Sequence, residues 1–202
     1  MSSVPKLTLV IGGARSGKSR YAEGLIAAQL PPWTYVATAE AGDHEMIARI
    51  RAHRKRRGVH WRTIEAPRDL QTALATGAGG PVLVDCLTLW LSNLMLAEMD
   101  VEREIEKLEA ALTAAAAPVV LVANEVGLGI VPEFPLGRRF RDQQGILNQA
   151  LTFAVAKQLA KHRNTSLKWG KTEFPGTQEK WNELASNGTS EKIRNNAIKR
   201  RG

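Results

Sequence analysis

The stretch IGGARSGKSR at residues 11–20 decides the fold of this chain. It contains the pattern G-x-x-x-x-G-K-S, preceded by the apolar run LTLVI and followed by a helix-like stretch. Between a strand and a helix, glycines let the backbone wrap around a phosphate with its N–H groups pointing inward. We therefore expect a phosphate-binding loop, in which Lys18 reaches the terminal phosphates and the Ser19 hydroxyl ligates Mg²⁺. The residues expected to contact a nucleotide here are Gly12, Gly13, Ala14, Arg15, Ser16, Gly17, Lys18 and Ser19.

Short apolar runs alternate with helical stretches along the first 149 residues. Strands are expected at 6–11, 34–40, 60–67, 81–88 and 118–126. Helices are expected at 19–28, 44–57, 68–76 and 89–116, the second of them capped by Asp43. Apolar strands that alternate with helices indicate a mostly parallel sheet with helices on both faces. We predict an α/β fold of the P-loop NTPase, RecA-like type for residues 1–149.

Net positive charge concentrates in the C-terminal quarter of the chain. Residues 150–202 carry 11 Lys/Arg and 4 Asp/Glu, whereas residues 1–149 carry 17 and 16. The net charge of +8 therefore gives no reason to expect nucleic-acid binding by the domain that holds the loop. We expect an atypical basic segment at 150–202. A helix at 150–162 would be followed by a poorly ordered polar stretch, because little apolar surface offsets the entropy of ordering it.

The overall composition places the protein in the cytoplasm. No run approaches 18 consecutive apolar residues, and the first residues lack the pattern of a secretory signal. The single cysteine, Cys86, cannot form an internal disulfide, which suits a reducing compartment. We expect a cytoplasmic protein without membrane contact.

A histidine among arginines marks the expected helix at 44–57. On a helix, His53 shares a face with Arg49, Arg56 and Arg57. Nearby cations disfavour the protonated imidazole and leave a neutral, nucleophilic nitrogen, while the same arginines could bind a polyphosphate. This combination suits attack on a phosphorus atom. A solvated basic helix face with an incidental histidine is the competing interpretation.

Asp85 ends the apolar strand expected at 81–88. A carboxylate at the end of a strand beside a phosphate-binding loop is typical of a second metal ligand, so we expect Asp85 and Ser19 to hold Mg²⁺. A strand-end aspartate that caps a turn is the alternative. The later strand is not followed by N-K-x-D, since Asn124 precedes Glu125, and a regulatory GTPase of the common type is disfavoured.

Five segments are characteristic of one enzyme family: GGARSGKSR at 12–20, YVATAEAGDHEMIARIRAHRKRR at 35–57, HWRTIEAP at 60–67, VDCLTLWLSNL at 84–94 and VANEVGLGIVPEFPLGRRFRDQQGILNQ at 122–149. In this order they resemble the bifunctional adenosylcobinamide kinase/adenosylcobinamide-phosphate guanylyltransferase of cobalamin biosynthesis. The segments R-I-x-x-H-x-x-R and N-E-V-G-x-G-I-V-P are more specific than the phosphate loop.

The resemblance implies two reactions on one chain. ATP or GTP phosphorylates the aminopropanol hydroxyl of adenosylcobinamide. GTP then gives its GMP to an enzyme histidine, which matches His53, and adenosylcobinamide phosphate takes that GMP to form adenosylcobinamide-GDP. The resemblance also implies a homotrimer. Further nucleotide contacts are implied at Ala37, Thr38, Ala39, Arg54, Lys55, Arg56, Arg57, Glu65 and Asp85.

Two other functions compete with this interpretation. A RecA-like nucleic-acid-dependent ATPase would use the same loop, but the basic charge lies in the C-terminal segment rather than beside it. A small-molecule kinase with a single activity would leave the cluster of His53 and arginines unexplained.

Overall fold

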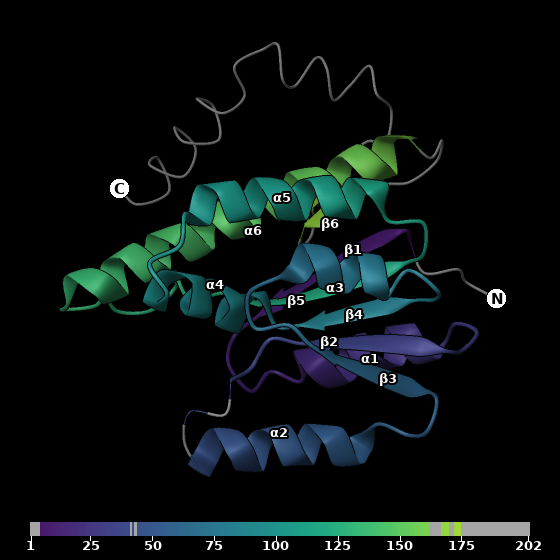
Figure 1. The fold of residues 1–202 in the computed structure, drawn as a ribbon. Helices are drawn as coiled ribbons and strands as arrows, with labels where there is room; N and C mark the ends of the chain where they lie inside the picture. Colours follow the sequence, from purple (N-terminus) through teal and green to yellow (C-terminus); the bar gives the residue numbers. More distant parts are fainter. Residues whose placement is uncertain (1–4, 41, 43, 162–166, 170–171, 175–202) are drawn as a thin grey trace. The chain divides into compact units, whose positions relative to one another are not determined.

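The computed structural model describes residues 5–161 without 41 and 43, and also residues 167–169 and 172–174 (Figure 1). The chain divides into two compact units, Met1–Ala154 and Val155–Gly202. The strands of the first unit are β1 (Leu7–Gly12), β2 (Trp33–Ala37), β3 (Trp61–Glu65), β4 (Val82–Asp85) and β5 (Val119–Asn124). Its helices are α1 (Lys18–Ala27), α2 (His44–Arg56), α3 (Leu70–Thr76), α4 (Leu87–Leu96), α5 (Val101–Ala114) and the first part of α6 (Pro135–Lys161).

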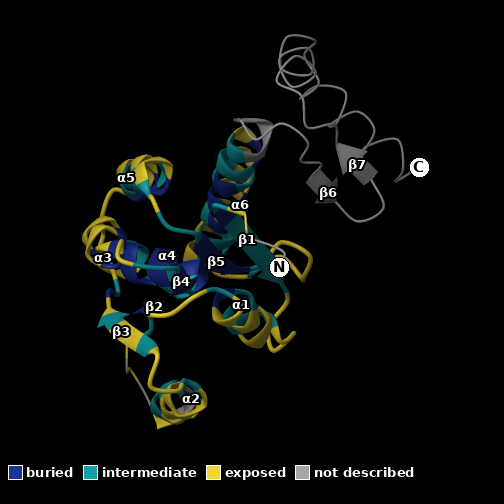
Figure 2. Cartoon of the chain, turned by 90° about the vertical axis from the view of Figure 1, so that its right-hand side faces the viewer, coloured by how far each residue is buried: buried dark blue, intermediate teal, exposed yellow. Residues whose placement is uncertain are grey.

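The five strands form one parallel sheet in the order β1-β5-β4-β2-β3. Helix α1 covers one face, and α3, α4 and α5 lie on the other (Figure 2). This arrangement confirms the predicted α/β fold. The register pairs Gly12 with Asn124, and Ala37 with both Asp85 and Glu65. The carboxyl ends of the strands therefore meet along one edge of the sheet, where ligands of open parallel sheets bind.

Apolar strands and the inner side of α1 form the core on one face of the sheet. Ala22 and Ile26 of α1 pack in one cluster with Leu83, Val120 and Val122. All five side chains are buried, with at most 1% of their surface exposed. This packing fixes α1 against the centre of the sheet, and so fixes the loop that precedes α1.

The expected helix at 89–116 is two helices in the structure. Glu98 has a φ of 53°, which a continuing right-handed helix does not allow. Asp100 then caps α5, its side chain accepting a hydrogen bond of 3.1 Å from the backbone N–H of Arg103. A new N-cap and a residue with positive φ outweigh the helical composition of the whole stretch, so the single-helix prediction was wrong.

The helix expected at 150–162 begins earlier, at Pro135, and runs to Lys161. Proline suits the first turn of a helix, where its missing N–H costs nothing. The predicted domain boundary after residue 149 lies inside this continuous helix, and the two compact units meet at Ala154–Val155. That boundary stays a prediction.

In the second unit, β6 (Leu167–Trp169) and β7 (Thr172–Phe174) pair antiparallel. The rest of the predicted polar stretch, and the predicted cap Asp43, lie outside the described residues. Of the helices in the described ranges, none combines the length and apolarity needed to cross a membrane.

Candidate active site

The phosphate-binding loop lies between the end of β1 and the start of α1. Gly17 adopts a left-handed conformation with a φ of 86° immediately before α1, which explains a glycine at this position. A Cβ at Gly12 would lie 3.1 Å from the Ser16 hydroxyl oxygen, so the loop folds tightly over the strand end. The Lys18 ammonium donates a hydrogen bond of 2.6 Å to the Gly13 carbonyl and so lies across the loop. Burial lowers the pKa of Lys18, whereas Cys86 and Asp85 raise it.

One cavity of about 540 Å³ joins the loop to the arginine-rich helix α2. That volume suits a small-molecule site. Among the predicted site residues, those that line it are Ala14, Arg15, Ser16, Gly17, Lys18, Ser19, Ala37, Ala39, His53, Arg54, Arg56, Arg57, Glu65 and Asp85. The two clusters inferred separately from the sequence therefore face the same space.

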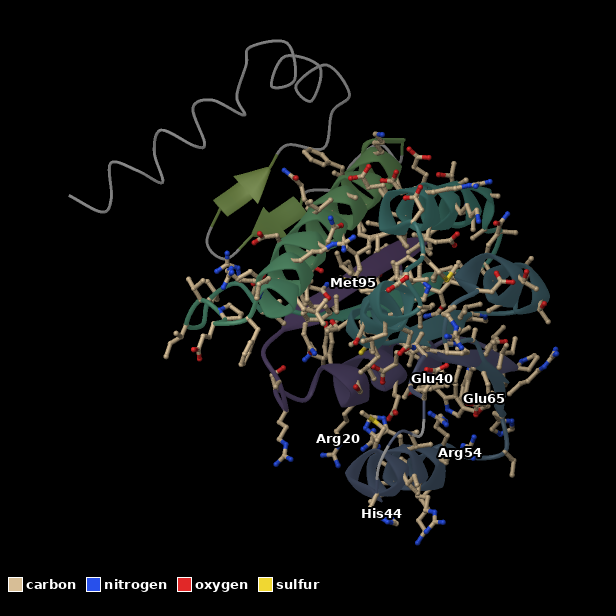
Figure 3. The ribbon with its side chains drawn as sticks, turned by 60° about the vertical axis from the view of Figure 1, so that its left-hand side comes forward. Arg20, Glu40, His44, Arg54, Glu65 and Met95 are labelled. Atoms are coloured by element: carbon tan, nitrogen blue, oxygen red, sulfur yellow. The ribbon has the colours of Figure 1, made fainter. Side chains whose placement is uncertain are left out.

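The C-terminal turn of α2 is connected to three elements by its arginines. Arg54 forms an ion pair with Glu65 at the end of β3, and Figure 3 shows these two residues close together. Arg56 Nη2 lies 3.1 Å from Glu23 Oε1 of α1. Just beyond the helix, the Arg57 guanidinium lies 3.5 Å from the centroid of a tyrosine ring on β2. The ion pair between Arg54 and Glu65 is exposed and contributes little free energy. Together, the three contacts place the basic turn over the cavity.

His53 faces a carboxylate from the sheet. Its Nδ1 lies 3.8 Å from Oδ2 of Asp85, whose side chain is only 8% exposed. Burial lowers the pKa of His53 and so do Arg56 and Arg57, against the raising effects of Asp85 and Glu23. The imidazole is therefore neutral at pH 7. With Nδ1 toward the carboxylate, Nε2 is the nitrogen left to form a bond.

Several predicted contacts lie away from the cavity lining. Thr38 is fully buried, and its hydroxyl both donates to the Cys86 carbonyl at 2.7 Å and accepts from the Cys86 N–H at 2.8 Å. Thr38 thus joins the end of β2 to the residue after β4. Gly12, Gly13 and the exposed Lys55 are also absent from the lining, and the side chain of Arg49 lies outside the described part of the chain.

Sequence reasoning missed other residues that line the cavity: Arg20, Tyr35, Met46, Ile50, Cys86, Leu89, Val122 and Asn124. Tyr35 could have been found, because it lies two residues before Ala37 on a strand and so shares its face. Cys86 is no rival nucleophile. Burial, with Asp85 beside it, raises the pKa of its thiol to about 11, so the thiolate is scarce at neutral pH.

Comparison with known proteins gives a consistent result. The family described as cobinamide kinase / cobinamide phosphate guanyltransferase matches residues 8–163. The chain belongs to this family. It is 48% identical to the bifunctional adenosylcobalamin biosynthesis protein CobP of Pseudomonas aeruginosa over 159 residues. The aligned region covers 73% of this chain and 92% of the relative.

Two further relatives are named bifunctional adenosylcobalamin biosynthesis protein CobU. The protein of Salmonella typhimurium is 43% identical and that of Escherichia coli 42%, each over 166 residues, 74% of this chain and 91% of the relative. The resemblance seen in the five sequence segments is confirmed, and the family match continues past Gln149 to residue 163.

Membership of this cobinamide kinase/guanyltransferase family gives the chain its two reactions. It phosphorylates cobinamide, and it transfers a guanylyl group to cobinamide phosphate. The two predicted activities are confirmed, and the family assignment favours them over a nucleic-acid-dependent ATPase and over a kinase with a single activity.

Proposed function

We propose that the cavity is the shared active site of both reactions and that His53 is the residue that accepts GMP. The observation that carries this proposal is the placement of the phosphate loop, His53 and Asp85 around one space. A nucleoside triphosphate bound with its terminal phosphates on the loop would extend its α-phosphate toward α2.

In the kinase step, backbone N–H groups of the loop and Lys18 hold the terminal phosphates of ATP or GTP. The hydroxyl oxygen of cobinamide forms a bond to the γ-phosphorus and loses its proton to water. The bond between that phosphorus and the β–γ bridging oxygen breaks, and the nucleoside diphosphate leaves. Lys18 stabilises the charge that develops on the phosphates, so it acts as a catalytic residue.

In the guanylyl step, Nε2 of His53 attacks the α-phosphorus of GTP. A P–N bond forms, the bond to the α–β bridging oxygen breaks, and pyrophosphate leaves. The imidazole ring becomes cationic, because Nδ1 keeps its proton, and the Asp85 carboxylate 3.8 Å away compensates that charge. A phosphate oxygen of cobinamide phosphate then attacks the same phosphorus, the P–N bond breaks, and neutral His53 returns.

The arginines at the end of α2 and just beyond it complete the nucleotide site in this proposal. Arg54, Arg56 and Arg57 line the cavity and supply fixed positive charge for the α-phosphate and the departing pyrophosphate. Glu65 lies at the same edge, paired with Arg54, and offers a carboxylate that can accept hydrogen bonds from a nucleoside. Lys55 and Thr38 stay predicted nucleotide contacts from the family resemblance, and Arg49 stays one from its place on the expected helix face of His53.

Mg²⁺ fits the oxygen atoms that the cavity offers. Ser19 and Asp85 both line it, and hydroxyl and carboxylate oxygens are ligands that this ion prefers. The described residues contain no cluster of three or more His, Cys, Asp or Glu placed for a metal. That suits an ion held by few protein ligands and by phosphates. When bound, Mg²⁺ would neutralise phosphate charge.

We also propose a cytoplasmic homotrimer. The family resemblance supports the trimer, and the lone Cys86 is in keeping with a reducing compartment. Light scattering of the purified protein tests the assembly. A chain of 22.1 kDa should give a particle of about three times that mass, and a monomer mass would contradict the trimer.

Covalent labelling tests the role of His53. Incubation with α-labelled GTP and Mg²⁺ should label the protein and release pyrophosphate. The label should be lost in mild acid and persist in base, because protonation of nitrogen makes it a good leaving group. His53→Ala should abolish labelling and guanylyl transfer while cobinamide phosphorylation largely continues, since the loop is untouched.

Two other histidines provide matched controls. His44 is exposed and points away from the sheet (Figure 3), and His60 packs its ring edge-on against Trp33, 5.7 Å between centroids. His44→Ala and His60→Ala should both keep the label. A labelled His53→Ala protein would mean that the acceptor lies elsewhere.

A further inference from the structure

Tyr35 lies in the middle of β2 and directs its hydroxyl at the carboxylate of Asp85. Its side chain is 4% exposed, and the hydroxyl donates a hydrogen bond of 2.9 Å to Oδ2 of Asp85. The same oxygen faces Nδ1 of His53 at 3.8 Å. Tyr35 and His53 therefore approach one carboxylate oxygen, from a strand and from a helix that are separate in sequence.

The aromatic ring of Tyr35 makes a second contact. The guanidinium of Arg57 lies over the ring, 3.5 Å from its centroid. Trp61 on β3 packs against the ring edge-on, with 6.2 Å between centroids, and holds its plane. A guanidinium over an aromatic face is favoured, more so when water is excluded. One buried side chain thus contacts both the carboxylate of β4 and the basic end of α2.

We propose that Tyr35 is a positioning residue for guanylyl transfer. Its hydroxyl fixes the Asp85 carboxylate in the orientation that faces His53, and its ring seats Arg57 at the phosphates. This inference rests on the proposed role of His53.

The two contacts of Tyr35 can be removed separately. Tyr35→Phe keeps the ring, and with it the contacts to Arg57 and Trp61, but leaves the carboxylate without its donor. The carboxylate is then free to turn toward Lys18, whose charge also acts on it. Tyr35→Leu removes the ring as well. The hydroxyl should matter for the rate of P–N bond formation, and the ring for the binding of GTP.

Single-turnover labelling with α-labelled GTP measures both quantities. For Tyr35→Phe we expect the rate constant at saturating GTP to fall about tenfold, as for loss of a hydrogen bond to a charged group. The GTP concentration at half-maximal rate should stay within about twofold. For Tyr35→Leu that concentration should rise by about fivefold. Tyr21 is an exposed tyrosine on α1, so Tyr21→Phe is the matched control and should behave as wild type.

A role in folding alone would not produce this pattern. A single-turnover rate constant does not depend on the fraction of protein that is active, so partial unfolding cannot mimic a slower step. If Tyr35 acts through Asp85, Tyr35→Phe and Asp85→Asn slow labelling by removing the same interaction. In an Asp85→Asn background, Tyr35→Phe should then slow labelling by less than about twofold further.

The results that would contradict this inference differ from those that would contradict the proposed function. A Tyr35→Phe rate constant equal to wild type, with no label on His53→Ala, would overturn the positioning role alone. Full multiplication of the Tyr35→Phe and Asp85→Asn effects would overturn it too. A labelled His53→Ala protein would instead remove the acceptor on which the inference rests.

Discussion

Comparing Lys18→Ala with His53→Ala should separate the contribution of the phosphate loop to catalysis from that of His53. The Lys18 ammonium reaches back to the Gly13 carbonyl at 2.6 Å, across the mouth of the loop. A phosphate entering the loop would replace that carbonyl as its partner. Lys18→Ala therefore removes a positive charge from the position where the transferred phosphoryl group develops negative charge, and leaves the backbone N–H groups in place.

The size of the loss follows from the charge and its distance. Two unit charges about 4 Å apart interact by about 4 kcal/mol at an effective dielectric constant near 20. Each 1.36 kcal/mol corresponds to about a tenfold change in rate, which gives an upper value of about a thousandfold. Lys18 is only partly buried, so water screens part of this. We expect kcat/KM for cobinamide phosphorylation to fall by about a hundredfold to a thousandfold.

The assay transfers labelled phosphate from γ-labelled ATP or GTP to cobinamide. Lys107→Ala is the control, because Lys107 lies on α5, pairs with Glu104 and is absent from the cavity lining. Guanylylation of His53 should also slow in Lys18→Ala, since both reactions use the loop, whereas His53→Ala should affect guanylyl transfer alone. A kinase loss of less than about tenfold, in a protein whose melting curve is unchanged, would refute the assignment of Lys18.

Three further outcomes are expected. Asp85→Asn should raise the Mg²⁺ concentration needed for half-maximal activity, and an unchanged Mg²⁺ titration would remove Asp85 from the metal site. Because burial holds the pKa of His53 below its ordinary value of 6.5, the midpoint of the decline in labelling rate at acidic pH should lie below 6.5; a midpoint above 6.5 would show that the imidazole is not kept neutral. Thr38→Val should lower the free energy of unfolding by about 1–3 kcal/mol, because the backbone N–H and carbonyl of Cys86 lose their partner. Urea unfolding measures this change, and an unaltered midpoint would contradict it.

The phosphate loop was predictable because its signal is local. A strand, a glycine-rich turn and a helix N-terminus follow one another within 14 residues, from Leu7 to Arg20, and each restricts the backbone on its own. The meeting of Ala37, Glu65 and Asp85 was predictable in outline. Parallel strands present their carboxyl ends at one edge of the sheet. The strand order β4-β2-β3, which places Ala37 beside both Asp85 and Glu65, came from the structure.

The remaining errors have two sources, a local helix cap inside a helical composition and a contact between residues distant in sequence. The composition of 89–116 is helical throughout, but the Asp100 cap and the positive φ of Glu98 divide it. The start of α6 was missed because Gly137 and Gly145 weaken the helical pattern. Its buried Asn148 amide nevertheless donates to the Asn124 carbonyl at 3.2 Å, which fastens the helix to β5. That contact spans 24 residues and could not be predicted from periodicity.

In the proposed mechanism, the charges around His53 have to meet two opposite requirements. Binding polyphosphate requires many cations, whereas a nitrogen nucleophile must be neutral before attack and tolerate a positive charge after it. Burial and the flanking Arg56 and Arg57 favour the neutral imidazole. A uniformly basic helix would also oppose the cationic ring that forms on attack. Asp85 supplies the missing carboxylate from β4, 3.8 Å from Nδ1. In the proposed mechanism the arginine-rich helix therefore depends on its neighbours, because Asp85 of β4 and Glu23 of α1 bring negative charge to the face that carries His53.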